Sequence, residues 1–212
     1  MAYGSALTAE LTGATTRQLG YWRNGTPPVL EPEISRRPLL YSFRDLLALR
    51  TVAKLRTDHS LQGIRRALDN LRDLGNFDHL SRYRLVGDGR SIALVESSNE
   101  AIDLLKKPGQ EILVKLSDVV RSFETETRVV PDLRRPRPNL RIDPKLLGGF
   151  PVAANSRVPY DVVAELVLDG VEPDDVHQYY PTVSADAARD AADFALQVDQ
   201  QRSPQERRLR IA

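Results

Sequence analysis

The chain has 212 residues, which is enough for one large domain or two small ones. Its 30 Lys and Arg residues nearly balance 29 Asp and Glu, so overall charge favours no class of partner and only local clusters of charge can. The absence of cysteine excludes disulfides, thiol catalysis and thiolate metal sites. No apolar stretch is long enough to cross a bilayer, so we expect a cytoplasmic protein with no membrane partner.

The stretch LTGATTRQLGYWRNG has the pattern of a helix, a tight turn and a second helix. Apolar spacing predicts the first helix over residues 5–12, and Gly13 ends it. Thr15 or Thr16 can cap the second helix, residues 17–23, because a Thr hydroxyl accepts a hydrogen bond from a free backbone N–H of the first turn. A glycine and two prolines follow, and they end this helix.

A second pair of helices is predicted after an irregular segment over residues 29–42. Ser42 can cap a helix over residues 43–57, which carries a full set of buried-face Leu, Val and Ala residues. Ser60 can cap another helix, in which Leu and Ile recur every three or four residues up to position 74.

After the second helix pair, the spacing of apolar residues changes from a helical period to a pattern typical of strands. RYRLVGDGRSIALVES places Asp88-Gly89 between two runs of Val, Leu and Ile, which predicts a hairpin with a two-residue turn. QEILVKL, residues 110–116, predicts a third strand, and Ser117 can cap a helix that reaches about Thr127. A proline- and arginine-rich run follows, which predicts an extended linker and a domain boundary.

Three more helices are expected, over residues 160–168, 173–180 and 185–199. The fold class is therefore predicted to be mainly α with a small β element, a winged helix-turn-helix followed by a C-terminal three-helix domain that is itself helix-turn-helix-like. The expected division is a head (1–75), a strand-containing connecting or dimerisation region (76–127), a Pro/Arg linker (128–140), the three-helix domain (141–198) and a flexible basic tail (199–212).

The second helix of the head carries many side chains that can bond to DNA. In a helix-turn-helix the second helix enters the major groove, where Arg reads guanine and Gln reads adenine, while Tyr and Thr hold phosphates. A helical hairpin with a solvated polar face would show the same pattern, and Leu19 and Trp22 fit the core better than a DNA contact. The candidate contacts are Thr15, Thr16, Arg17, Gln18, Tyr21 and Arg23.

The order of motifs in residues 5–74 resembles the DNA-binding domain of the MerR family. The residues that carry it are LTGATTRQLGYWRNGTPPVL, LYSFRDLLALRTVAKLR and SLQGIRRAL, with Tyr41, Ser42 and Asp45 in the family's Tyr-Ser/Thr-x-x-Asp pattern. The resemblance implies a wing between the helix pairs, in which Arg36 and Arg37 can contact DNA. Gly20 and Leu39 stand where the family usually has arginines. The family's long dimerising coiled coil and metal-binding cysteines are missing.

Residues 141–198 resemble a small three-helix domain of bacterial antitoxins. The carrying motifs are Ile142-Asp143-Pro144, Gly148-Gly149-Phe150-Pro151, Ser156-Arg157-Val158-Pro159, Glu172-Pro173-Asp174-Asp175 and Tyr180-Pro181. Ser156 replaces the usual Thr, and Asn155 stands where Gly is usual.

A MerR-like head joined to this domain resembles a VapB-type antitoxin. This implies a cytoplasmic homodimer that binds double-stranded operator DNA, represses its own operon, and inhibits a cognate PIN-like ribonuclease toxin. The tail arginines, Arg202, Arg207, Arg208 and Arg210, can bind the acidic metal site of such a nuclease. A solvated basic end or a phosphate-binding arm remains an alternative for them. The alternative for the whole chain is a one-component MerR-like regulator with a C-terminal ligand-sensing module.

No residue pattern points to catalysis or to a cofactor. The histidines, His59, His79 and His177, are scattered without ligand spacing and are expected to be surface or capping residues rather than a metal site. Asp174 and Asp175 begin a helix, where carboxylates stabilise the helix dipole. We therefore expect a binding protein rather than an enzyme.

Overall fold

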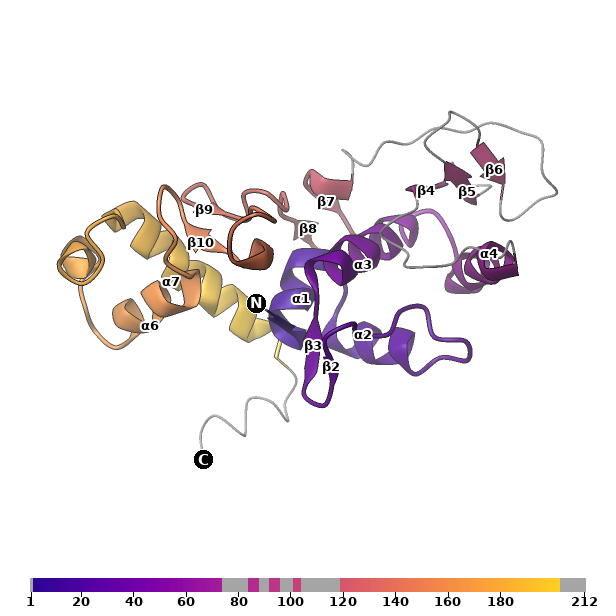
Figure 1. Ribbon diagram of the computed structural model, residues 1–212, viewed down its shortest axis with the longest axis horizontal. Coiled ribbons are helices and arrows are strands. Elements are labelled where there is room, and N and C mark those ends of the chain that lie inside the picture. Colours follow the sequence, from indigo (N-terminus) through magenta and orange to yellow (C-terminus); the bar gives the residue numbers. More distant parts are fainter. Residues whose placement is uncertain (1, 74–83, 88–91, 96–100, 104–118, 203–212) are drawn as a thin grey trace.

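The computed structural model describes residues 2–73, 84–87, 92–95, 101–103 and 119–202 of the chain, and side chains within residues 2–68 and 119–202. Helices dominate, and the strands are short (Figure 1). The fold class predicted from the sequence, mainly α with a small β element, is confirmed. No helix among the described residues is long and apolar enough to span a membrane.

The head begins with the two predicted helices, α1 (Ser5–Thr12) and α2 (Thr16–Arg23). Gly13 ends α1 in the left-handed conformation, with a φ of 82°, and its N–H donates to the Ala9 carbonyl at 3.1 Å. A Cβ at Gly13 would lie 2.5 Å from the Val130 side chain. Glycine at this turn thus serves both the backbone conformation and the close approach of a distant segment.

A three-stranded antiparallel sheet flanks these helices, in the order β1-β3-β2. Its strands are β1 (Tyr3–Gly4), β2 (Ser35–Arg36) and β3 (Leu39–Tyr41), with Tyr3 opposite Tyr41 and Arg36 opposite Leu39. The β2–β3 hairpin projects from the head beside α2, in the position of a wing (Figure 1).

The second helix pair is α3 (Phe43–Leu55) and α4 (Leu61–Asp73). Ser42 caps α3 as predicted, since its hydroxyl accepts from the Asp45 N–H at 3.0 Å and Asp45 accepts in return from the Ser42 N–H at 2.8 Å. Ser60 caps α4 by accepting from the Gly63 N–H at 3.1 Å.

The strands after α4 differ in part from the prediction. β4 (Arg84–Gly87) pairs antiparallel with β5 (Ile92–Val95), with Gly87 opposite Ile92, and the turn predicted at Asp88-Gly89 lies outside the described residues. A third strand, β6 (Ala101–Asp103), was not predicted. The strand predicted over residues 110–116 lies outside the described residues.

The helix predicted to reach Thr127 is wrong in its second half. Residues 119–120 are helical, but β7 (Phe123–Glu124) and β8 (Val129–Val130) then form a hairpin. The sequence TETR between them is rich in Thr, and the Thr125 N–H donates to the Arg128 carbonyl at 2.9 Å, which closes a turn.

The Pro/Arg segment over residues 128–140 is irregular, as its prolines require, yet it is not a free spacer. Val130, Leu133 and Leu140 are buried in the core. The linker prediction therefore fails in one respect, because prolines forbid regular hydrogen bonding but leave the intervening apolar side chains free to pack.

The C-terminal part contains three helical elements as predicted, with small strands before them. β9 (Leu140–Arg141) pairs with β10 (Val152–Ala153), and the short 3₁₀ turn η2 (Leu147–Gly149) lies between them. The three helical elements are α6 (Tyr160–Leu168), the 3₁₀ helix η3 (Pro173–Gln178) and α7 (Ala185–Gln200).

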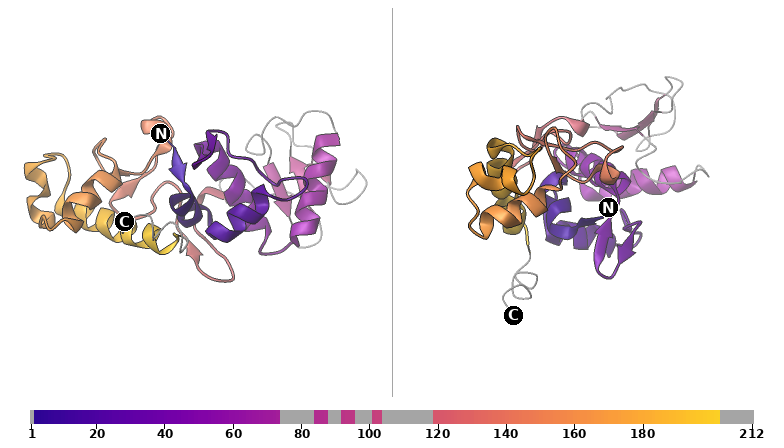
Figure 2. Two further views of the ribbon diagram at one scale, coloured as in Figure 1. Left: turned by 90° about the horizontal axis from the view of Figure 1, so that it is seen from below. Right: turned by 60° about the vertical axis from the view of Figure 1, so that its left-hand side comes forward.

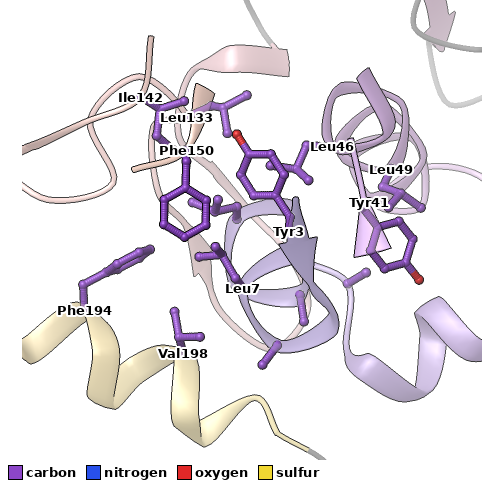
Figure 3. Close-up of a cluster of buried hydrophobic side chains, with 14 of the residues drawn as sticks. Tyr3, Leu7, Tyr41, Leu46, Leu49, Leu133, Ile142, Phe150, Phe194 and Val198 are labelled. Carbon is purple, nitrogen blue, oxygen red and sulfur yellow. The ribbon is translucent and has the colours of Figure 1, made fainter. Parts of the chain in front are cut away.

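One apolar core joins the head to the C-terminal part (Figure 3). Tyr3 of β1 packs against Phe150, Phe150 stacks on Tyr160, and Tyr160 meets Phe194 of α7 edge-on, with ring centroids 5.0–5.9 Å apart. Gly149 has a φ of 83°, and a Cβ there would lie 2.7 Å from Phe43 and 2.9 Å from the Tyr3 hydroxyl. The turn that carries Gly149 thus sits directly on the head.

A buried arginine ties the head to the segment after the connecting region. Arg50 of α3 is fully buried, and its guanidinium donates to the backbone carbonyls of Leu11, Val119, Val120, Arg121 and Pro131. Burial lowers the pKa of Arg50 to about 10. Carbonyl oxygens from three separate segments therefore converge on one cation.

A second polar junction involves Glu10 of α1. Arg128 donates to the Glu10 carboxylate at 2.7 Å, and Gln201, just beyond α7, donates to the same oxygen at 3.0 Å. Glu10, Arg128 and Gln201 are far apart in the sequence. Glu10 therefore links α1 to the β7–β8 hairpin and to the end of α7. Figure 2 shows the end of α7 beside the head.

Candidate nucleic-acid interface

Helix α2 is amphipathic, with one face in the core and one in solvent. Leu19 and Trp22 are buried, as their apolar character predicted. Arg17, Gln18 and Tyr21 lie on the opposite face and are exposed, Tyr21 by 59%. A large aromatic side chain left this exposed is available to a partner.

A reciprocal capping box fixes the start of α2. Thr15 is the N-cap, and its hydroxyl accepts from the Gln18 N–H at 3.1 Å. The Gln18 side-chain oxygen accepts from the Thr15 N–H at 2.8 Å. Because this oxygen is engaged, Gln18 cannot read adenine with both ends of its amide while the box is intact.

The arginines predicted to contact DNA lie on α2 and on the neighbouring β2–β3 hairpin, and they differ in their surroundings. Within the described part of the chain, the guanidinium groups of Arg17 and Arg37 have no hydrogen-bond or ion-pair partner. Arg36 pairs with Glu31, and Arg23 donates to the Asn24 side chain at 3.1 Å. Arg17 and Arg37 are thus the most available cations of the predicted set.

The wing arginines lie at the tip of the β2–β3 hairpin. Arg36 ends β2, and Arg37 begins the turn to β3, where both side chains are exposed. Leu39, which stands where an arginine is usual, is half-buried and packs on the core. The hairpin is therefore anchored through Leu39 and Tyr41 while its basic tip faces solvent.

Sequence analysis missed one arginine of this surface. Arg65 of α4 places its guanidinium 5.2 Å from the centre of the Tyr21 ring and packs against Gly25. A cation over an aromatic face is attracted by the ring quadrupole. Arg65 therefore restrains Tyr21, and no signal in the sequence links the two residues, which lie on different helix pairs.

The β7–β8 hairpin approaches the start of α2 from the other side. A small cavity of about 80 Å³ lies between Gly13, Gln18 and Trp22 of the head and Thr125 and Glu126 of the hairpin. The hairpin thus packs on the turn of the helix-turn-helix and holds it against movement.

The C-terminal motifs form tight turns whose departures from the antitoxin pattern are conservative. Asn155 has a φ of 60°, the left-handed conformation that Gly would adopt and that Asn tolerates. The buried Ser156 hydroxyl donates to the Ala153 carbonyl at 2.9 Å and accepts from the Val158 N–H at 3.1 Å. The turn is therefore kept despite both substitutions.

The residues predicted to contact a toxin are only partly described. Arg202 pairs with Asp199 at 2.7 Å, and the adjacent Gln201 bonds to Glu10. The prediction of a free tail is therefore wrong for residues 199–202, because residues 199–200 end α7 and Gln201 bonds to the head. Arg207, Arg208 and Arg210 lie outside the described residues.

Two of the three histidines lie among the described residues. His59 is buried rather than on the surface, and its backbone N–H donates to the Leu55 carbonyl at 2.9 Å just after the end of α3. His177 is exposed and contacts the Asp174 carbonyl, while His79 lies outside the described residues. Among the described residues, no three His, Cys, Asp or Glu side chains form a cluster that could hold a metal ion. Asp174 and Asp175 lie in the first turn of η3, as predicted.

Comparison with family models identifies two parts of the chain. Residues 5–71 match the family described as MerR HTH family regulatory protein, and residues 140–195 match a family described as protein of unknown function (DUF433). The head is therefore similar to the helix-turn-helix domains of that family, and the second match begins at the end of the Pro/Arg segment.

Curated relatives include proteins named uncharacterized HTH-type transcriptional regulator, from Mycobacterium bovis and from two strains of Mycobacterium tuberculosis. Each is 36% identical to the chain over 110 residues, which is 50% of this chain and 48% of the relative. The chain thus matches about half the length of these relatives.

Among solved structures, the crystal structure of Rv2018 from Mycobacterium tuberculosis superposes with a TM-score of 0.54, covering 90% of this chain and 96% of that one at 18% identity. This likeness concerns the fold alone, and it extends over both the head and the C-terminal part.

Proposed function

We propose that this chain is an antitoxin that binds operator DNA to repress its own operon and binds a cognate PIN-like ribonuclease toxin to inhibit it. The single observation that carries the DNA half is the exposed face of α2, which carries Arg17 and Tyr21 on a helix that lies beside the β2–β3 hairpin (Figure 1). The match of residues 5–71 to a regulatory helix-turn-helix family supports the same half.

The geometry suits a duplex because α2 and the neighbouring β2–β3 hairpin each carry an exposed arginine. Arg17 on α2 is suited to base edges in the major groove, where a guanidinium bonds guanine at two atoms. Arg37 at the wing tip is suited to the phosphate backbone. Tyr21, held by Arg65, supplies a hydroxyl to a phosphate between them.

The DNA half is tested by fluorescence anisotropy with the duplex that lies upstream of the reading frame. We expect Arg17→Ala to weaken specific binding by about 5- to 100-fold, since a base contact contributes roughly 1–3 kcal/mol. Arg37→Ala should weaken binding to all sequences and should lower the number of counterions released on binding by about one, which a shallower salt dependence of the affinity measures.

Arg135→Ala is the matched control, because Arg135 is an exposed arginine in the Pro/Arg segment, away from α2 and the wing. It should bind the duplex as the parent chain does. If the Arg17 and Arg37 variants also bound with unchanged affinity, the proposed surface would be incorrect.

The toxin half is supported by the antitoxin-like motifs of residues 141–198, which form the compact turns described above. A PIN-like nuclease holds Mg²⁺ between clustered carboxylates, and arginine guanidinium groups complement such a site. Arg207, Arg208 and Arg210, together with Arg202, supply that chemistry.

Co-expression with the product of the neighbouring reading frame tests this half. The full chain should restore growth to cells that express the toxin, and deletion of residues 203–212, which spares Gln201 and Arg202, should abolish protection. Full protection by the truncated chain would show that another surface inhibits the toxin. A neighbour that is not a nuclease would favour the alternative, a one-component regulator.

A homodimer follows from this function, because two linked heads on paired half-sites multiply a modest affinity. Light scattering of the purified chain measures its mass directly. A monomer both free and on DNA would contradict the dimer.

A further inference from the structure

An open groove of about 670 Å³ runs between α6 and α7 in the C-terminal part. Its apolar lining includes Ala164 and Leu168 from α6 and Ala195, Leu196 and Val198 from α7. Leu168 and Leu196 are 52% and 51% exposed, although both belong to well-packed helices. Two half-exposed leucines on facing helices form an apolar strip that solvent does not favour.

The rim of this groove on α6 is acidic. Asp161, Glu165 and Asp169 line it at intervals of four residues, which places them on one face of the helix and just beyond its end. All three are exposed, and within the described part of the chain none of them pairs with a basic side chain. A row of like charges beside an apolar strip favours a partner that is both basic and apolar.

The chain itself contains a segment of this composition beside the groove. Residues 203–212, SPQERRLRIA, carry Arg207, Arg208 and Arg210 together with Leu209 and Ile211. Arg202, which lines the groove, immediately precedes this segment. A tether this short gives a local concentration in the millimolar range, so even weak contacts are occupied.

The reach of the segment is sufficient. Ten residues span at most about 33 Å when extended, whereas the helical distance from Arg202 back to Ala195 is about 10 Å. Pro204 lies just after the end of α7, where a proline stops the helix and allows the chain to turn back.

We propose that the α6–α7 groove is the docking site of the chain's own basic segment, residues 203–212. The arginines pair with Asp161, Glu165 and Asp169 along the α6 rim, and Leu209 and Ile211 cover Leu168 and Leu196. This inference goes beyond the proposed function, since it needs neither DNA nor a toxin.

The absence of cysteine makes a direct test possible, because one introduced thiol carries the only spin label. The full chain is labelled at Ile211→Cys, and the broadening of backbone amide signals over Asp161–Leu168 is measured by NMR. We expect strong broadening of the α6 signals, which is lost at about 0.5 M salt because exposed charges are then screened.

The matched variant carries Asp161→Asn, Glu165→Gln and Asp169→Asn together with the same label. Because the three side chains are exposed, its urea midpoint should equal that of the parent chain. We expect the α6 broadening to be lost, since removal of three surface pairs weakens docking about tenfold. Retained broadening would refute the pairing with these carboxylates.

A mixed sample separates docking within one chain from exchange between two. Spin-labelled chain without ¹⁵N is combined with unlabelled ¹⁵N chain, and the same α6 signals are followed. Broadening of the α6 signals in this mixture would show that a second copy supplies the segment and would overturn the proposal. No α6 broadening in any sample would also overturn it, and it would leave the DNA and toxin proposals standing.

Discussion

Arg50 shows how much a single buried side chain can connect. Its guanidinium donates to five backbone carbonyls from α1, the residues before β7, and Pro131. Nothing in the sequence distinguishes Arg50 from the exposed arginines on neighbouring helices, because its partners are 39 to 81 residues away. Its role therefore could not be predicted from spacing.

Replacement of Arg50 by Met should destabilise the chain by about 3 kcal/mol or more, since several buried carbonyls lose their donor at once. Urea unfolding followed by circular dichroism measures the change. Arg50→Lys should give an intermediate loss, because an ammonium reaches fewer acceptors. Arg44→Met, at an exposed position, is the control, and equal stability of the Arg44 and Arg50 variants would contradict the role of Arg50.

The buried tyrosines determine how the stability of the fold changes at alkaline pH. Burial raises the pKa of Tyr3 and Tyr160, and it raises the pKa of Tyr41 to about 12, while Arg23 opposes and Asp45 adds to the last shift. The unfolded chain loses these protons near pH 10, whereas the folded chain keeps them, so tyrosine burial costs stability as pH rises above about 10. Arg50 acts in the opposite direction, because the unfolded chain retains its proton longer.

Tyr41→Phe should therefore flatten the fall of the urea midpoint between about pH 10 and 12. At neutral pH the substitution should change stability little, because the Tyr41 hydroxyl has no hydrogen-bond partner within the described part of the chain. An unchanged alkaline slope would contradict the buried position of this phenol.

At the scale of elements, local signals predicted well. Ser42 and Ser60 cap the helices that they were expected to cap, and Gly13 ends α1 where predicted. The β7–β8 hairpin was not foreseen, because its strands pair over only two positions and have no alternating pattern. Its stability comes from packing on Gly13, a tertiary contact that sequence periodicity does not contain.

Gly20 lies inside α2, where glycine lowers helix stability relative to alanine. No atom lies within 4 Å of the position that a Cβ would take, so a side chain meets no obstacle. Gly20→Ala should stabilise the fold by about 0.8–1.0 kcal/mol through helix propensity. Thermal unfolding measures this gain, and a loss of stability would show that the glycine has a role that the geometry does not reveal.

The candidate DNA surface was also predictable in outline. Leu19 and Trp22 were expected in the core from their apolar character, and Arg17 was expected outside it, and the structure places them so. The engagement of the Gln18 amide in the capping box could not be weighed from the sequence, because capping and base reading require the same side-chain type.

At the scale of the whole molecule, the division into separate units is less sharp than composition suggested. The core runs from Leu46 of α3 through Tyr3 and Phe150 to Phe194 of α7. The Pro/Arg segment contributes Val130 and Leu133 to it. Composition detects prolines in a segment but not which apolar side chains between them are buried.

We expect the head and the C-terminal part to unfold together. Differential scanning calorimetry should show one transition for both, with a calorimetric enthalpy close to the van't Hoff value. A separate transition for the C-terminal part would contradict the shared core. Phe150→Ala should lower the single transition temperature rather than split the transition, because its ring contacts both parts.

The carboxylate of Glu10 has one further consequence. It accepts hydrogen bonds from Gln201 and Arg128, and it lies on α1, the helix that precedes α2. A ligand that binds at the C-terminal end of α7 either leaves the hydrogen bond between Gln201 and Glu10 intact or breaks it. If DNA binds one of these two states more tightly than the other, DNA and this ligand change each other's affinity by the same factor. Under the proposed function, this partly buried amide would couple DNA binding by the head to ligand binding at the C-terminal end of α7.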